Sequence, residues 1–180
     1  MSKLSNSTLN ITELDIAIIG GGSAGITLAS KLNNCSAVVI EPLTPAERDC
    51  SWALWAGSHQ QKKLAGATKG SWKHWKLNDY HTEINHYSDQ YRYTSLSSAQ
   101  YMAQCESNLA EGVDLIRAQA DDIVAEGNGG SFTAAGQHYK VAQLYDSRPP
   151  KMSDNGLKQH FLGWEIRTKY SISHSEIAIL

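Results

Sequence analysis

The chain lacks any long hydrophobic run. Apolar residues make up 41% of its 180 residues, an ordinary share for a globular protein. No stretch approaches the ~18 consecutive apolar residues of a membrane-spanning helix. The first 13 residues are polar, with no basic segment followed by an apolar one, so we expect no signal peptide. These absences together predict a cytoplasmic location.

An excess charge of one sign is also missing. Lys and Arg total 16 against 18 Asp and Glu, a net charge of −2, which predicts no nucleic-acid partner. The three cysteines are far apart and form no C-x-x-C, so we expect reduced thiols. His81 and His86 flank Glu83, but they do not form H-E-x-x-H, and residues five apart do not share a helical face. No metal site is therefore expected.

A glycine-rich segment between two short apolar segments is the most informative feature. Ile16–Ile19 predict a buried strand, and Val38–Ile40 predict the next one. Between them Gly20, Gly22 and Gly25 have the spacing G-x-G-x-x-G and precede a predicted helix. In such units the glycines permit a tight turn, the approach of a pyrophosphate and close helix–strand packing. The segment predicts a dinucleotide site; the alternative is an ordinary strand–turn–helix corner.

Glu41 ends the second predicted strand, about 20 residues after the first glycine of the motif. An acid at this place accepts a hydrogen bond from a ribose hydroxyl and disfavours NADP, whose extra phosphate it would repel. The alternative is a solvated acid at a strand end. The candidate cofactor-binding residues of this unit are Gly20, Gly21, Gly22, Ser23, Ala24, Gly25 and Glu41.

The alternation of strand and helix stops after Glu41. Residues 50–80 have no clear period and hold four tryptophans, Trp52, Trp55, Trp72 and Trp75. These are interpreted either as packing aromatics or as a wall beside a flavin ring or a long apolar ligand. Residues 80–95 alternate as extended segments do, and Ser97–Leu109 predict a helix capped by Ser97 or Ser98.

A third strand and an antiparallel meander are expected next. The predicted strands are Val113–Arg117, Asp122–Glu126, Ser131–Ala134 and His138–Leu144, separated by glycine-containing turns. Their order predicts an α/β fold: an FAD-binding, Rossmann-like domain of the glutathione-reductase type, with a parallel sheet, a β-meander and the start of an inserted substrate domain. NAD-binding Rossmann chains do not have this order.

The predicted organisation has five segments. They are a disordered N-terminus (1–13), an FAD-binding βαβ unit (14–50), an aromatic-rich insertion of the substrate region (51–112), the return to the FAD-binding domain (113–150) and the start of a substrate domain (151–180). A polar linker at 151–157 opens the last segment, and Ile177–Leu180 predict a strand.

With these segments in place, the chain resembles the flavin-dependent lycopene cyclases. The chain is similar in five blocks. They are the glycine unit with Glu41, the tryptophan-containing Asp49–Trp55, the tyrosine-rich Tyr91–Tyr93 with the helix start Ser97–Tyr101, the turn Asp146-Ser147-Arg148-Pro149, and the segment Leu157–Ile166 with Thr168. The last two blocks, in this order, are the specific part. The resemblance implies that Asp146 and Arg148 also contribute to the FAD site.

The resemblance implies a reaction and its partners. FAD in its reduced form would accompany a proton-initiated, redox-neutral closure of the end ring or rings of lycopene or a related polyene. An apolar substrate implies peripheral association with a membrane surface. Trp52, Trp55 and Tyr91 would be wall residues for a cationic intermediate. The family's catalytic Glu lies in a later segment, so no catalytic residue is assigned here, Glu165 included, and we expect the chain to be truncated.

Two alternatives stay open. One is another FAD-dependent oxidoreductase, such as a monooxygenase, halogenase or isoprenoid reductase, built on the same glycine-rich domain. The other is a non-catalytic flavin-binding fragment. For the end of the chain, the alternative to truncation is a genuine C-terminal strand that completes a sheet.

Overall fold

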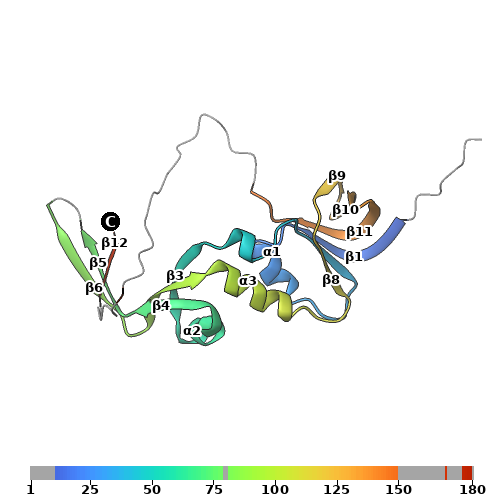
Figure 1. Cartoon of the computed structure of the whole chain (residues 1–180). Helices are drawn as coiled ribbons and strands as arrows, with labels where there is room; N and C mark the ends of the chain where they lie inside the picture. Colours follow the sequence, from blue (N-terminus) through green and yellow to red (C-terminus); the bar gives the residue numbers. More distant parts are fainter. Residues whose placement is uncertain (1–10, 79–80, 150–168, 170–175, 180) are drawn as a thin grey trace, which may run out of the picture. The chain divides into compact units, whose positions relative to one another are not determined.

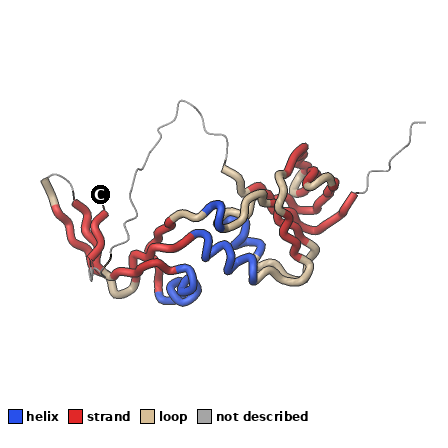
Figure 2. The backbone as a smooth tube through the Cα atoms, in the orientation of Figure 1, coloured by secondary structure: helices blue, strands red, loops and turns tan. Residues whose placement is uncertain are grey.

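A computed structural model describes residues 11–78, 81–149, 169 and 176–179. The described residues of 1–52 and 96–148 form one compact unit, and those of 53–95 and 149–180 form a second (Figures 1 and 2). The sequence predicts a disordered N-terminus over residues 1–13, but residues 11–13 belong to the first strand. Residues 1–10, the linker at 151–157, the Leu157–Ile166 block and Thr168 lie outside the described residues.

The first unit is built on a six-stranded sheet in the order β8-β2-β1-β11-β10-β9. Its strands are β1 (Ile11–Ile19), β2 (Ala37–Ile40), β8 (Val113–Ile116), β9 (Ala120–Glu126), β10 (Gly129–Ala134) and β11 (Gln137–Asp146). The neighbours β8-β2-β1-β11 pair in parallel, whereas β10 pairs antiparallel with β11 and β9. The predicted fold, a parallel sheet with an antiparallel meander, is confirmed.

Both faces of the parallel strands are buried, which explains why β1 and β2 end in uninterrupted apolar runs. Successive residues point to opposite faces, so Ile18 and Ile19 enter different cores. Ile18 packs in one cluster with Ile26, Met102 and other residues of the helices. Ile19 packs in the other with Phe132 and further residues of the meander. The carboxyl ends of β1 and β2 are therefore held firmly.

Two helices cover one face of this sheet, α1 (Ser23–Ala29) and α3 (Ser98–Ser107), which lie side by side (Figure 1). The predicted cap of α3 is confirmed, because the Ser97 hydroxyl accepts a hydrogen bond from the Gln100 N–H at 3.2 Å. The segment that leads away from Glu41 meets this helix start. Ser98 Oγ accepts from the Cys50 N–H at 2.8 Å, and Asp49 accepts from Ser97 Oγ at 3.0 Å.

The second unit contains two three-stranded sheets. Their orders are β3-β7-β4 and β12-β5-β6, with β3 (Ser51–Gly57), β4 (Thr68–Trp72), β5 (His74–Asn78), β6 (Glu83–Tyr87), β7 (Tyr91–Ser97) and β12 (Glu176–Ile179). A helix α2 (Ser58–Leu64) and a short 3-10 helix η2 (Ala65–Ala67) lie between β3 and β4. β12, where the sequence predicts a strand over Ile177–Leu180, pairs in parallel with β5.

The sequence assigns no elements to residues 50–80, and the structure shows why. α2 reads Ser-His-Gln-Gln-Lys-Lys-Leu and buries only Leu64, so no apolar stripe marks it. β3 buries only Ala56 fully, and its other side chains are partly or fully exposed. These short elements bury too little apolar surface for the hydrophobic period of a helix or of a strand to be visible in the sequence.

Two of the four tryptophans, Trp52 and Trp55, differ in how far they are exposed. Trp52 packs against the helix-side core of the first unit, and its ring lies edge-on to Tyr101 at 6.0 Å. Trp55 is 50% exposed, in the second unit. It makes edge contacts with Tyr93 at 5.2 Å and Trp75 at 6.1 Å. The packing interpretation holds for Trp52, and the exposed ring of Trp55 leaves the wall interpretation open for that residue.

The close packing at Gly25 predicts a strong effect of Gly25→Ala. A Cβ at this position would lie 1.9 Å from the Gly20 carbonyl oxygen and 2.7 Å from Ser147 Oγ. Because backbone must move to relieve this overlap, we expect a loss of at least 1–3 kcal/mol in the free energy of unfolding, roughly the cost of overpacking. Urea denaturation measures it. Gly22→Ala is the control, since a Cβ there meets no atom within 4 Å, and equal losses in the two variants would contradict the prediction.

Candidate functional site

The glycine turn joins the end of β1 to α1 and is held by two neighbouring strands. Gly20 has φ +95°, a left-handed conformation that favours glycine. Its N–H donates to the Ile40 carbonyl at 2.8 Å. On the other side the Ser147 N–H donates to the Ile19 carbonyl at 2.8 Å, and Ser147 Oγ donates to the Gly20 carbonyl at 2.6 Å. The Asp146-Ser147-Arg148 turn therefore lies directly against the glycine turn.

Within this turn, Gly25 and Gly22 face different surroundings. The overlap that a Cβ would cause at Gly25 shows that the first turn of α1 packs directly on the backbone of Gly20. At Gly22, the residue before α1, a Cβ would point into open space, and φ is an ordinary −66°. Ser23 and Ala24 follow in the exposed first turn of the helix. The protein itself needs the glycine at 25, whereas the surface at 22 to 24 is open.

Glu41 is buried at the end of β2, with 6% of its surface exposed. Its Oε2 accepts from the Gly21 N–H at 2.8 Å and from Arg48 Nη1 at 3.0 Å. Its Oε1 accepts from the Leu43 N–H at 3.0 Å. The N–H of Gly21, one of the predicted cofactor-binding residues, is thus engaged by Glu41. The carboxylate is a fixed part of the turn, unlike a solvated acid at a strand end.

Arg48 is a site residue that the sequence prediction missed. It ends a short 3-10 helix, η1 (Ala46–Arg48), and its Nη2 donates to the Gly21 carbonyl at 3.0 Å. The guanidinium therefore links the glycine turn to the carboxylate of Glu41. No motif marks Arg48; an arginine seven residues after the strand-end acid is the only signal in the sequence.

Asp146 and Arg148 bind each other. Arg148 Nε donates to Asp146 Oδ1 at 2.9 Å, and Nη2 donates to Oδ2 at 2.6 Å. The hydrogen bonds from the guanidinium lower the pKa of Asp146 and raise that of Arg148. Both side chains remain exposed by more than two fifths. The resemblance implies that both residues contribute to the cofactor site. Arg148 lies close to Gly20, and Ser147 between them is hydrogen-bonded to the glycine turn.

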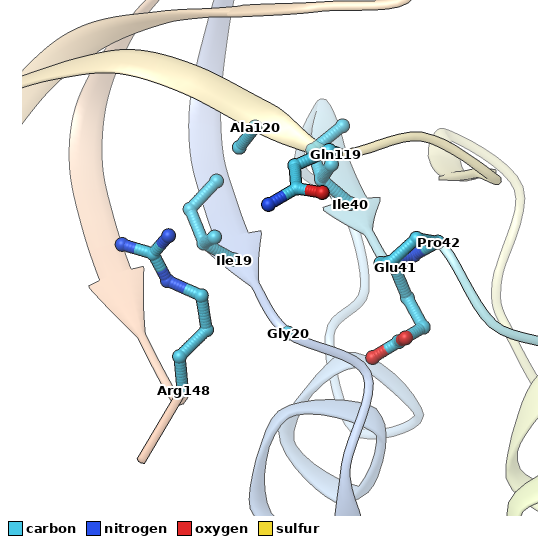
Figure 3. Close-up of a pocket in the computed structure, with 8 residues that line it drawn as sticks. All are labelled: Ile19, Gly20, Ile40, Glu41, Pro42, Gln119, Ala120 and Arg148. Atoms are coloured by element: carbon cyan, nitrogen blue, oxygen red, sulfur yellow. The ribbon is translucent and has the colours of Figure 1, made fainter. Parts of the chain in front are cut away.

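A pocket of about 160 Å³ opens at the carboxyl ends of β1 and β2 (Figure 3). Its lining residues are Ile19, Gly20, Ile40, Glu41, Pro42, Gln119, Ala120 and Arg148. The walls are mainly aliphatic, and the polar groups at its edges are a carboxylate, an amide and a guanidinium. Of the predicted site residues, the structure brings Gly20, Glu41 and Arg148 together around this pocket. Gln119 was not predicted.

The described residues carry no group of three His, Cys, Asp or Glu side chains that could hold a metal ion. In the same part of the chain, no helix is long and apolar enough to cross a membrane. Cys35, Cys50 and Cys105 are free thiols.

The pair formed by Asp146 and Arg148 predicts a pH-dependent contribution to stability. At pH 7 we expect Asp146→Asn to lower the free energy of unfolding by no more than about 1 kcal/mol, because the pair is well exposed. Since the folded-state pKa of Asp146 is lowered, its contribution is complete above the usual aspartate value of about 3.9 and disappears as the pH falls through the lower folded value. Urea titrations at several pH values measure this. A difference that persists unchanged in strong acid would contradict it.

Comparisons with solved structures show the same fold in proteins that include two described with FAD. One of the similar proteins is a geranylgeranyl bacteriochlorophyll reductase-like protein from Thermoplasma acidophilum, with 15% identity and a TM-score of 0.58 over 76% of this chain. Another is pqsL, a probable FAD-dependent monooxygenase from Pseudomonas aeruginosa, with 11% identity and a TM-score of 0.59 over 74% of this chain. The halogenase PltM, in complex with phloroglucinol and FAD, is also similar, with 11% identity and a TM-score of 0.57 over 75% of this chain. The chain spans 39%, 42% and 34% of these three proteins, respectively.

A search of the curated proteins found no match. A family profile described as lycopene cyclase protein matches residues 15–177. This range includes the glycine turn, Glu41, the Asp146-Ser147-Arg148 turn and the second unit's strands up to β12. The predicted resemblance is confirmed, and the chain belongs to the lycopene cyclase family.

Proposed function

We propose that the first unit binds FAD, with the adenosine part in the pocket of Figure 3 and the diphosphate over the glycine turn. The open space at Gly22 is the observation that carries this proposal. Gly25 is required by the packing of the protein, but nothing in the described structure occupies the position of a side chain at Gly22. A glycine there leaves the backbone accessible, as the approach of a pyrophosphate requires.

The other groups around the pocket fit the same ligand. Glu41 lines the pocket and presents a carboxylate that can accept from a ribose hydroxyl. The aliphatic walls, among them Ile19 and Ile40, suit a purine ring, and Gln119 offers both a donor and an acceptor. The N–H groups of Ser23 and Ala24, in the first turn of α1, lack intrahelical acceptors and suit a phosphate. The PltM complex shows that a protein of this fold holds FAD.

Gly22→Val tests the FAD proposal. The added side chain enters open space, so we expect the fold to remain intact while FAD affinity falls at least tenfold, a loss of about 1.4 kcal/mol in binding free energy. Quenching of flavin fluorescence during titration measures the affinity, and thermal melting measures the stability.

Ala125→Val is the matched control for this variant. Ala125 is an exposed residue of β9 that does not line the pocket, and the substitution also yields a valine. We expect it to leave FAD affinity unchanged. Equal FAD affinity in the Gly22→Val protein and the wild type would remove the glycine turn from the binding site.

We further propose that the protein to which these residues belong closes an end ring of lycopene or a related polyene. A proton adds to one end of the polyene, a carbon–carbon bond closes the six-membered ring, and a proton leaves a neighbouring carbon, so no net oxidation occurs. Bound FAD in its reduced, anionic form would supply a negative charge beside the cation. Family membership supports this reaction. An apolar substrate also supports peripheral contact with a membrane surface.

Of the three predicted wall residues, Trp55 and Tyr91 are each half exposed, and we propose that Trp55 contacts the cation. Half of its surface is exposed, and Tyr93 and Trp75 hold its ring from two sides. Aromatic faces attract cations by about 0.5–2 kcal/mol. Trp52, which packs in the core of the first unit, is less suited to this role.

Expression of the complete coding sequence in a lycopene-accumulating host tests the reaction. We expect conversion of lycopene to a cyclised carotenoid with no net consumption of NADPH or oxygen, measured by pigment chromatography. Trp55→Ala should lower the conversion severalfold because the aromatic face is lost, whereas Trp55→Phe should retain most of it. Unchanged lycopene together with consumption of NADPH and oxygen would instead favour a flavin monooxygenase.

A further inference from the structure

Arg48 carries more contacts than a surface arginine near a strand end requires. Four fifths of its side chain is buried, and the guanidinium joins the Glu41 carboxylate to the Gly21 carbonyl through Nη1 and Nη2. Its Nε is buried and has no hydrogen-bond partner among the described residues. An unpaired buried N–H opposes folding. Stability alone therefore does not explain why an arginine occupies this position.

The contacts of Glu41 define what it can still bind. A carboxylate has about four acceptor positions, two on each oxygen. Oε2 accepts from Gly21 and Arg48, whereas Oε1 accepts only from Leu43 among the described donors. Arg48 thus fixes the carboxylate in an orientation that uses both positions of Oε2. One position on Oε1 has no donor among the described residues, and Glu41 lines the pocket where a ligand hydroxyl would lie.

The charge of Arg48 is as important as its geometry. A buried carboxylate beside the glycine turn would repel a diphosphate that lies on that turn, and the repulsion is strong where water is excluded. The guanidinium lies 3.0 Å from the carboxylate oxygen and balances its charge. Arg148 near the turn is paired in the same way with Asp146. With both pairs formed, the net charge around the turn is close to zero.

We propose that Arg48 is a positioning and specificity-determining residue of the nucleotide site. It orients Glu41 so that one carboxylate oxygen receives a single ribose hydroxyl, and it cancels the charge of Glu41 so that the site accepts a nucleoside diphosphate group. This inference rests on the proposed binding of FAD. It concerns the ADP half of that ligand and involves no contact between Arg48 and the flavin.

The test compares ADP with adenosine, which differ by the diphosphate. In Arg48→Gln we expect affinity for ADP to fall at least tenfold more than affinity for adenosine. Both ligands lose the orientation of Glu41 toward the ribose, but only ADP meets the uncompensated charge of Glu41. Isothermal titration calorimetry on the whole chain measures both. The loss for ADP should shrink at high salt, which screens charge. A merely structural role predicts equal losses for the two ligands, and that result would overturn the proposal.

Two further variants make the result unambiguous. Glu41→Gln combined with Arg48→Gln removes both charges and should recover part of the ADP affinity that Arg48→Gln loses. Arg48→Lys keeps the positive charge, so its ratio of ADP to adenosine affinity should stay within about threefold of the wild-type ratio. This variant also tests the charge argument if Arg48→Gln does not fold. A loss of ADP affinity in Arg48→Lys as severe as the loss expected for Arg48→Gln would contradict the charge argument.

Arg117→Gln is the matched control. Arg117 binds the same segment, through the Leu43 carbonyl at 2.8 Å, and pairs with Glu106. Its hydrogen bonds among the described residues include none to Glu41 or to the glycine turn. Loss of Arg117 should leave the ratio of ADP to adenosine affinity unchanged. A change in that ratio as large as the change in Arg48→Gln would assign the effect to overall charge and overturn the proposal.

The wild-type chain separates this proposal from the proposed function. If the wild-type chain binds neither FAD nor ADP, the proposed function fails. If it binds both and Arg48→Gln behaves like wild type, only the role of Arg48 fails.

Discussion

The close approach of α1 to the turn at the end of β1 is the constraint on which the first unit depends. Gly25 leaves no room for even a methyl group between the helix and the Gly20 carbonyl, and Ser147 Oγ binds that same carbonyl. One backbone oxygen thus fixes a helix, a strand end and the last turn of the unit. Because residues so far apart in sequence converge on it, the pocket beside the turn has a defined shape.

A second layer of polar contacts builds on that framework. Glu41 binds the N–H of Gly21, and Arg48 binds both Glu41 and the Gly21 carbonyl. The turn is therefore held at Gly21 as well as at Gly20, where Ser147 binds. Buried charges persist in proteins when they are paired and hydrogen-bonded. Under the proposal for Arg48, the pair also determines which charges a ligand meets at the turn.

Local patterns predicted much of the first unit. The apolar ends of β1 and β2, the glycine spacing, the serine cap of α3 and the glycine-punctuated meander each depend on contacts between near neighbours, and each is found close to its expected place. The elements between Ser51 and Asn78 were not found, because α2 is polar on nearly every face and β3 is only partly buried. Their structure depends on partners that no short window of sequence contains.

For the candidate site, the sequence by itself determined the residues whose roles are set by the local chain: the glycines, which the turn and the helix approach require, and the acid at the end of the second strand. Tertiary structure alone decided the rest. Arg48, Gln119 and Ser147 join the site because three separate chain segments meet at the carboxyl ends of β1 and β2. The physical reason is that hydrogen bonds and charge pairing act through space at about 3 Å, and only the folded chain brings these atoms within that range.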